Sequence, residues 1–182
     1  TIHSANGLLA TSSLQTARLC LNHTSQKKLV RLKGSLGVQV VDEISCVPAD
    51  LLHADALRTT YARAAVHKLN SADYMKPQET WGRLPLLVLS GDFLQLPPVP
   101  AAASLIASTR GRSYEHQQGV ALLAGVDYVV DFVEVKRFEN PLQLELLQAM
   151  REPGGQRLRP EVWSAVAATE IRACADASQL DS

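Results

Sequence analysis

The chain has 182 residues, of which 46% are hydrophobic and 20% are charged. These proportions are typical of a folded globular protein and exclude a disordered tail, a collagen-like repeat and a coiled coil. No run approaches the ~18 consecutive apolar residues that a membrane helix needs, so we expect no membrane association. The three cysteines lack the spacing of a metal site and leave one unpaired, which favours a reducing compartment over a disulfide scaffold.

The formal net charge is zero, but the charges are unevenly distributed along the chain. The first 41 residues contain no acid and five bases, which are Arg18, Lys27, Lys28, Arg31 and Lys33. Such a segment either contacts phosphate groups or forms a solvated face. The chain begins at Thr1 without a signal-peptide pattern, so we expect a processed protein or a piece of a longer one.

The first half of the chain predicts two buried strands around a helix. The first strand, Val38–Val41, is apolar and follows a glycine. The stretch Ala49–Leu69 lacks Gly and Pro and predicts a helix. Its expected inward face consists of Leu51, Ala54, Arg58, Tyr61, Ala62, Ala65 and Leu69, with Arg58 as the exception to the apolar pattern. Residues 71–83 predict a loop before the second strand, Leu84–Leu89.

In the second half, residues 100–118 are small and polar, and we expect a mobile segment there. The apolar run Tyr128–Val135 predicts a third strand. Asn140 can cap a helix that starts at Pro141, and a further helix is possible over Glu161–Ala177. Short buried strands separated by helices favour an α/β fold with a parallel, doubly wound sheet.

Two polar motifs follow the first two predicted strands. Asp42 and Glu43 come directly after the first strand, at the sheet edge where open α/β folds bind ligands. One carboxylate near a magnesium ion and a second that orients water is the arrangement that phosphoryl transfer to water requires. The second strand leads into the sequence GDFLQLPPV of Gly91–Val99, in which Gln95 can contact a phosphate or a water and two prolines stiffen the loop.

The DEIS sequence of Asp42–Ser45, followed by GDFLQLPPV, closely resembles the Pif-type DNA helicases, in the RecD-like branch of helicase superfamily one. The TIHS sequence of Thr1–Ser4 resembles a family element on the DNA side of the first motor domain. Val133–Arg137 and Leu146–Arg151 resemble the segment that enters the second motor domain. The resemblance implies an incomplete P-loop NTPase motor with a RecA-like parallel sheet and flanking helices. Residues 1–135 would be part of the first motor domain, and 136–182 the start of the second or an interdomain segment.

By resemblance, the site residues are those of an ATP-dependent DNA helicase that uses ATP as substrate and Mg²⁺ as cofactor. Asp42 would hold magnesium and Glu43 would activate water. Gln95 would sense the γ-phosphate, and Arg137 would reach that phosphate from the domain interface. Thr1 and His3 would touch the backbone of single-stranded DNA. For His3, the alternative is a solvated terminal residue.

The resemblance further implies a monomer that acts on single-stranded DNA and DNA junctions in telomere maintenance, repair or recombination. It implies a nuclear or mitochondrial protein in a eukaryote, and a cytoplasmic one otherwise.

The sequence also departs from the family pattern. No phosphate-cradling loop ending in Gly-Lys-Thr or Gly-Lys-Ser occurs in the 182 residues, and Gly34-x-x-Gly37 lacks the lysine. Phe138 stands where the family usually has glutamine, and Cys46 replaces a usual methionine. Two other interpretations therefore stay open. One is a non-catalytic remnant acting as a binding or scaffold module, and the other is a RecD-type or conjugative relaxase helicase.

Overall fold

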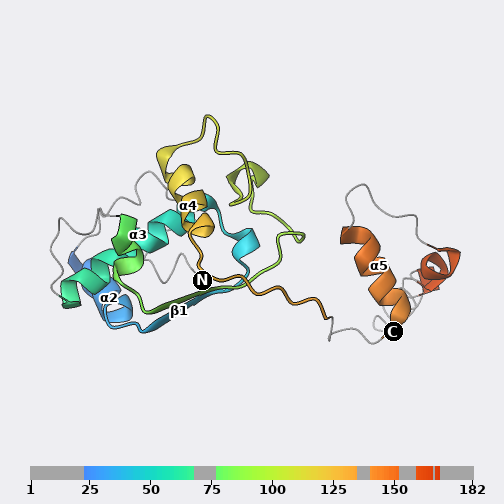
Figure 1. Cartoon of the computed structure of the whole chain (residues 1–182), viewed down its shortest axis with the longest axis horizontal. Helices are drawn as coiled ribbons and strands as arrows, with labels where there is room; N and C mark the ends of the chain where they lie inside the picture. The colour runs from blue at the N-terminus through green and yellow to red at the C-terminus, as the bar shows by residue number, and fades with distance from the viewer. Residues whose placement is uncertain (1–22, 68–76, 135–139, 152–158, 166, 169–182) are drawn as a thin grey trace, which may run out of the picture. The chain divides into compact units, whose positions relative to one another are not determined.

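The computed structural model describes residues 23–67, 77–134, 140–151, 159–165 and 167–168 (Figure 1). The chain divides into two compact units, Thr1–Asp127 and Tyr128–Ser182, which are described separately below. No described helix has both the length and the apolar character needed to cross a bilayer.

The first unit contains a two-stranded parallel sheet made of β1 (Val38–Val41) and β2 (Leu86–Leu89). Val38 pairs with Leu86, and the register continues to Val41 opposite Leu89. Both predicted strands are present, but the expectation that they are buried is wrong, because Val41 is the one buried residue of the two strands. In addition, β2 begins two residues later than expected. Pro85 explains the difference, because proline has no N–H to donate to a ladder.

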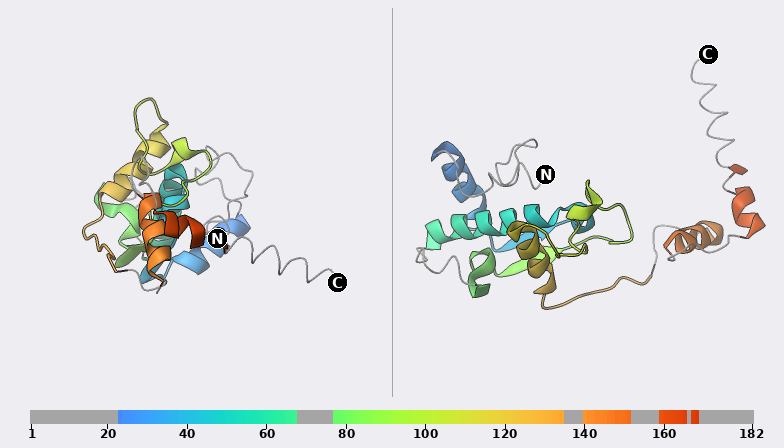
Figure 2. Two further views of the ribbon diagram at one scale, coloured as in Figure 1. Left: turned by 90° about the vertical axis from the view of Figure 1, so that its right-hand side faces the viewer. Right: turned by 90° about the horizontal axis from the view of Figure 1, so that it is seen from above.

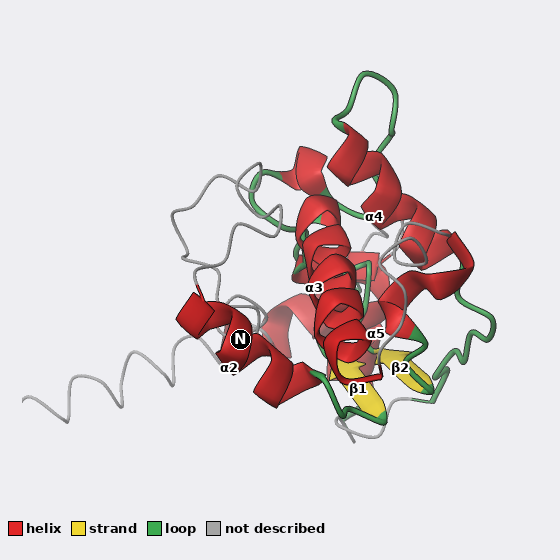
Figure 3. Ribbon diagram, turned by 90° about the vertical axis from the view of Figure 1, so that its left-hand side faces the viewer, coloured by secondary structure: helices red, strands yellow, loops and turns green. Residues whose placement is uncertain are grey.

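Helix α3 (Ala49–His67) covers one face of this sheet and forms the centre of the core (Figures 1 and 3). Seen from above in Figure 2, it runs along the strands. The predicted inward face is confirmed at four positions, including Arg58, which is only 3% exposed, whereas Ala65 is exposed. The core brings together α3, the turn after β1 and later segments; its buried residues are Val41, Ile44, Val47, Ala49, Leu51, Leu52, Ala56, Trp81 and Leu105.

Within the first unit, no described residue covers the other face of the sheet. Because side chains alternate along a strand, this face presents exposed Val38, Val40, Leu86 and Val88. The structure is therefore a mixed α/β fold with parallel pairing, as predicted. The expected doubly wound arrangement, with helices on both faces, is not seen in the described part of the chain.

Helix α2 (His23–Lys33) is joined to α3 and β1 through a buried polar cluster. The ammonium group of Lys33 donates to the Asp55 carboxylate and, at 3.0 Å, to the hydroxyl of Thr59. Gln39 of β1 donates from Nε2 to Asp55 Oδ2 at 2.6 Å and accepts from Thr59 Oγ1 at 3.2 Å. Burial lowers the pKa of Lys33, and the neighbouring Asp55 carboxylate opposes that shift. These bonds link two helices and the first strand.

A second buried cation, Arg63 of α3, fastens the helix to the loops on either side of it. Its Nε donates to the carbonyl of Gly82 at 2.8 Å, and Nη2 donates to that of Arg83 at 3.1 Å. Nη1 donates to the Leu36 carbonyl, just before β1. The predicted loop over residues 71–83 contains the short 3₁₀ helix η4 (Pro77–Gly82), and residues 71–76 lie outside the described part.

The sequence prediction missed helix α4 (Tyr114–Ala124), which lies partly within the segment expected to be mobile. Ser113 caps this helix by accepting a hydrogen bond from the His116 N–H at 3.2 Å. A Cβ on Gly119 would lie 1.8 Å from the carbonyl oxygen of Ala49, so α4 approaches the start of α3 very closely. Ala101–Ala103 forms the short 3₁₀ helix η5.

The second unit contains α5 (Pro141–Arg151), which confirms the predicted helix. Asn140 caps it by accepting from the N–H of Leu142 at 2.9 Å. The expected third strand is wrong over Tyr128–Glu134, where the described backbone forms no strand and the side chains are exposed. A β-branched run becomes a strand only when it pairs with another. The helix expected over Glu161–Ala177 is present at 161–165 and 167–168; the rest of that range lies outside the described residues.

Candidate functional site

The two sequence motifs lie next to each other at the carboxyl edge of the sheet. Val41 and Leu89, the last residues of β1 and β2, are partners in the parallel ladder. Asp42 and Ser90 therefore leave the sheet at the same level. This confirms that the fold brings DEIS and GDFLQLPPV together, although 45 residues separate the end of one from the start of the other.

Backbone hydrogen bonds hold the two loops against each other. The N–H of Ser90 donates to the Val41 carbonyl at 2.9 Å, and the N–H of Ile44 donates back to the Ser90 carbonyl at 2.9 Å. A Cβ on Gly91 would lie 2.8 Å from the Ile44 nitrogen, so a side chain there would push the loops apart. Glycine is therefore required at position 91 by the close approach of the first motif.

The first motif presents both of its carboxylates to solvent. Asp42 and Glu43 are exposed, and Asp42 Oδ1 accepts a hydrogen bond from the N–H of Glu43 at 3.0 Å. Glu43 has φ 53° and ψ 45°, in the left-handed region. A side chain with a Cβ rarely adopts this conformation, and such residues concentrate at functional sites. The turn then buries Ile44 and Ser45, so that the two acids are displayed on a fixed support.

The second motif forms a fastened loop that displays Gln95. Asp92 Oδ1 accepts from the N–H of Leu94 at 2.9 Å, and the N–H of Gln95 donates to the Asp92 carbonyl at 3.0 Å. Farther along, the Cys46 thiol donates to the Leu96 carbonyl at 3.3 Å, and Pro98 is buried. Gln95 itself is exposed, between two hydrogen bonds that join this loop to the segment after β1, one at Ser90 and one at Leu96.

Asp92 also lies at this edge of the sheet, but it was not among the site residues predicted from the sequence. It lies in the second loop, which is bonded to the turn that follows Asp42. The signal that could have identified it is the same one that identified Asp42, an acid soon after the end of a buried strand. The buried cluster around Asp55 also escaped prediction, because Lys33 and Asp55 are 22 positions apart in the sequence.

The donors at this edge fit magnesium only when phosphate oxygens complete its coordination. Among the described residues, no group of three or more His, Cys, Asp or Glu side chains could hold a metal ion. Mg²⁺ in nucleotide sites is bound by one or two carboxylates together with phosphates and waters. Asp42 satisfies that smaller requirement. The lysine-bearing loop that cradles the phosphates in such sites does not occur in the 182 residues.

Three predicted site residues fall outside the described part of the chain. Thr1 and His3 precede residue 23, and Arg137 lies within 135–139. Their assignments stay predictions.

Comparison of the chain with protein-family models, with curated proteins and with solved structures finds no match. The functional interpretation therefore depends on the two motifs and on the geometry that joins them.

Proposed function

We propose that this chain is part of an ATP-dependent DNA helicase of the Pif type, comprising most of its first RecA-like motor domain and the start of the second. One observation carries this proposal. The DEIS turn and the GDFLQLPPV loop, identified from the sequence alone, are neighbours at the carboxyl edge of a parallel sheet, joined by hydrogen bonds from Ile44 to Ser90 and from Cys46 to Leu96. That edge is where open α/β sheets bind nucleotides.

In the proposed reaction, Asp42 would hold a magnesium ion, which would supply neutralisation of charge while the γ-phosphate of ATP is transferred to water. Glu43 accepts a hydrogen bond from the attacking water and orients it. Its exposed carboxylate and its fixed backbone suit that task, because efficient hydrolysis requires the water to be placed in line with the bond that breaks.

Gln95 is proposed to report the presence of the γ-phosphate to the rest of the domain. Its loop is tied to the DEIS turn before it, through Ser90, and after it, through the Leu96 carbonyl. The proposal assigns Arg137 to the stabilisation of charge in the transition state, from the second motor domain. DNA would then be gripped mainly through its phosphates and stacked bases, with little dependence on sequence.

The second candidate is a non-catalytic module with the same fold, which the missing phosphate loop supports if the complete gene product also lacks that loop. The 182 residues lack the phosphate-cradling loop, and without its lysine and backbone amides the β- and γ-phosphates have no holder. The two candidates differ in what the complete gene product contains. The helicase requires a Gly-Lys-Thr or Gly-Lys-Ser loop upstream of Thr1, whereas the module does not.

DNA-stimulated ATP hydrolysis by the product of the complete coding sequence tests the proposal. We expect hydrolysis by that protein, and no hydrolysis above background by residues 1–182 alone. Activity of the isolated 182 residues that Glu43→Gln abolishes would show that the assumed need for an upstream loop is wrong. A complete protein that neither binds nor hydrolyses ATP would favour the non-catalytic module.

A further inference from the structure

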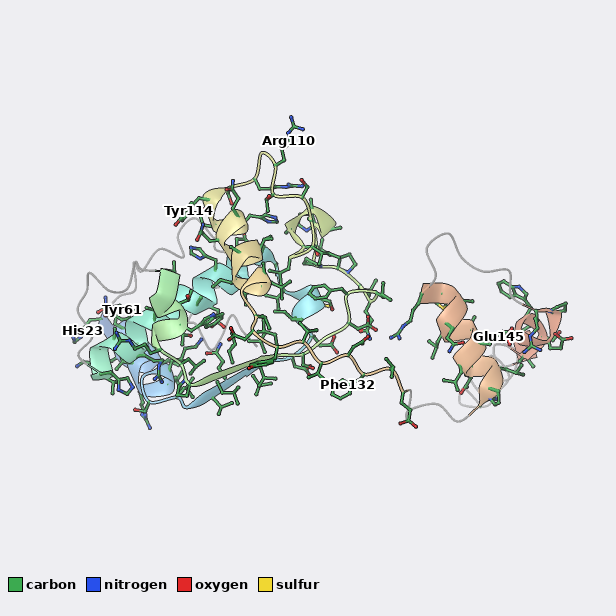
Figure 4. All side chains as sticks on the ribbon, in the orientation of Figure 1. His23, Tyr61, Arg110, Tyr114, Phe132 and Glu145 are labelled. Atoms are coloured by element: carbon green, nitrogen blue, oxygen red, sulfur yellow. The ribbon has the colours of Figure 1, made fainter. Side chains whose placement is uncertain are left out.

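An open groove of about 340 Å³ lies between α2 and α3 in the first unit, and belongs to neither of the two motifs. Its lining consists of His23, Gln26, Lys27, Val30, Arg31 and Tyr61. Five of these residues come from α2, and Tyr61 comes from α3. Figure 4 labels His23 and Tyr61, which face the groove from the two helices.

The α2 side of the groove is a stripe of basic side chains. His23, Lys27 and Arg31 recur every four residues, so they lie on one face of the helix at intervals of about 6 Å. All three are exposed, and α2 contains no acid. Within the described part of the chain, no ion pair is recorded for Lys27 or Arg31.

The stripe has two opposing effects on its helix, since Arg31 in the last turn of α2 interacts favourably with the helix dipole. Like charges four residues apart repel each other and weaken a helix. Lys33, at the end of α2, differs from Lys27 and Arg31, because it is buried and paired with Asp55. The two cations of the groove are left facing solvent, where an anionic ligand can neutralise them.

The opposite wall supplies an aromatic ring. Tyr61 is half-buried on α3, so its position is fixed by the helix while part of the side chain stays accessible. A row of cations that follows a phosphate backbone, beside an aromatic side chain on which a base stacks, is the usual composition of a single-strand binding groove. An acidic peptide would use the cations but would gain little from the ring.

We propose that the α2–α3 groove binds single-stranded DNA, with successive phosphates along His23, Lys27 and Arg31 and a base stacked on Tyr61. The choice of DNA rests on the proposed function. The side chains of the groove themselves indicate a ligand that has negative charges and an aromatic ring. The interval of about 6 Å between neighbouring cations is comparable with the separation of successive phosphates along a single strand.

Fluorescence anisotropy of a labelled oligothymidylate, titrated at low salt with the 182-residue chain, tests this proposal. Lys28 provides the matched control, because it is exposed on the same helix and carries the same charge but does not line the groove. We expect Lys27→Ala to weaken binding several-fold and Lys28→Ala to change it by less than about two-fold. The slope of log K against log salt should also fall by about 0.7 in the Lys27 variant only.

The ring is tested by two substitutions at one position. Tyr61→Phe should keep the affinity, whereas Tyr61→Leu should weaken it by about five-fold or more, since stacking needs an aromatic face. Circular dichroism confirms that each variant is folded. Equal losses in the Lys27 and Lys28 variants, an unchanged Tyr61→Leu variant, or tighter binding of a polyglutamate peptide than of DNA would each overturn the proposal.

These outcomes are separable from those of the helicase proposal. If the complete protein fails to hydrolyse ATP while the isolated chain shows the expected Lys27 and Tyr61 effects, the groove assignment is supported and the helicase proposal is wrong. If ATP hydrolysis is normal and the groove variants bind like wild type, only the groove assignment is wrong.

Discussion

Removal of the Lys33 ammonium should destabilise the first unit, because the Asp55 carboxylate would be left buried without its nearest cation. Lys33 is 4% exposed and Asp55 is fully buried. Breaking a buried ion pair from one side typically costs about 3–5 kcal/mol. We expect the lower end of that range for Lys33→Met, since Gln39 still donates to the carboxylate and the Arg58 guanidinium also interacts with it electrostatically.

The double variant Lys33→Met/Asp55→Asn separates the ion pair from the packing around it. Asparagine keeps the hydrogen bond from Gln39 but has no charge to leave unpaired. We therefore expect the double variant to be more stable than Lys33→Met by about 1–2 kcal/mol. The coupling energy follows when the effect of Asp55→Asn alone is also subtracted, and it is larger than this difference if that single substitution destabilises the fold. Strict additivity of the two single substitutions would show that the pair is not coupled.

Urea unfolding followed by tryptophan fluorescence measures these free energies. The chain has two tryptophans, of which Trp81 is buried in the core of the first unit and Trp163 lies in the second unit. A Trp163→Phe background leaves Trp81 as the reporter of the relevant unit. A loss below about 1 kcal/mol for Lys33→Met would refute the reasoning, because an uncompensated buried charge cannot be that inexpensive.

Three further predictions concern helix packing, pH dependence and signalling from the nucleotide. Gly119→Ala should lower the free energy of unfolding by about 1–3 kcal/mol, because its Cβ would collide with Ala49, whereas Gly37→Ala has open space and should be tolerated; equal urea midpoints would contradict this. Burial lowers the pKa of His53 below 6.5, so the folded chain takes up a proton less readily than the unfolded one. The free energy of unfolding should therefore fall as the pH drops below about 6.5. Urea unfolding at about pH 7.5 and about pH 5.5 measures this fall, which should be smaller in His53→Gln. The same pH dependence in the variant and the wild type would contradict the role of His53. In the complete protein, Gln95→Ala should slow DNA-stimulated hydrolysis and reduce unwinding still more, while leaving DNA binding without nucleotide unchanged; wild-type rates for both would exclude the relay.

The sequence was sufficient to predict elements whose local signal agrees with their surroundings. Val38–Val41 contains three valines and follows a glycine, and it forms a strand with those bounds. Pro141 and the capping Asn140 defined the start of α5. The neighbouring positions of Asp42 and Gly91 also followed from the rule that parallel strands end at one edge.

The failures arose where distant partners decide the structure. The run Tyr128–Val135 has the composition of a strand, yet its described residues pair with no other strand. Arg58 looked like an exception on an apolar face, but it is buried in an electrostatic environment that includes Asp55. The capping role of Ser113 in α4 was hidden in a polar segment whose helix is packed against α3 through Gly119. None of these contacts is visible in a local window of sequence.

The most direct test of the proposed motor is the effect of Glu43→Gln on ATP binding and hydrolysis in the product of the complete coding sequence. The amide keeps the shape of the side chain but polarises the attacking water poorly, and Glu161→Gln, an exposed glutamate of the second unit, serves as the control. We predict that Glu43→Gln binds ATP with wild-type affinity and loses at least about 100-fold in turnover, whereas Glu161→Gln behaves like wild type. Equal turnover in the Glu43 variant and the wild type would contradict the assignment of the DEIS turn as the site of hydrolysis.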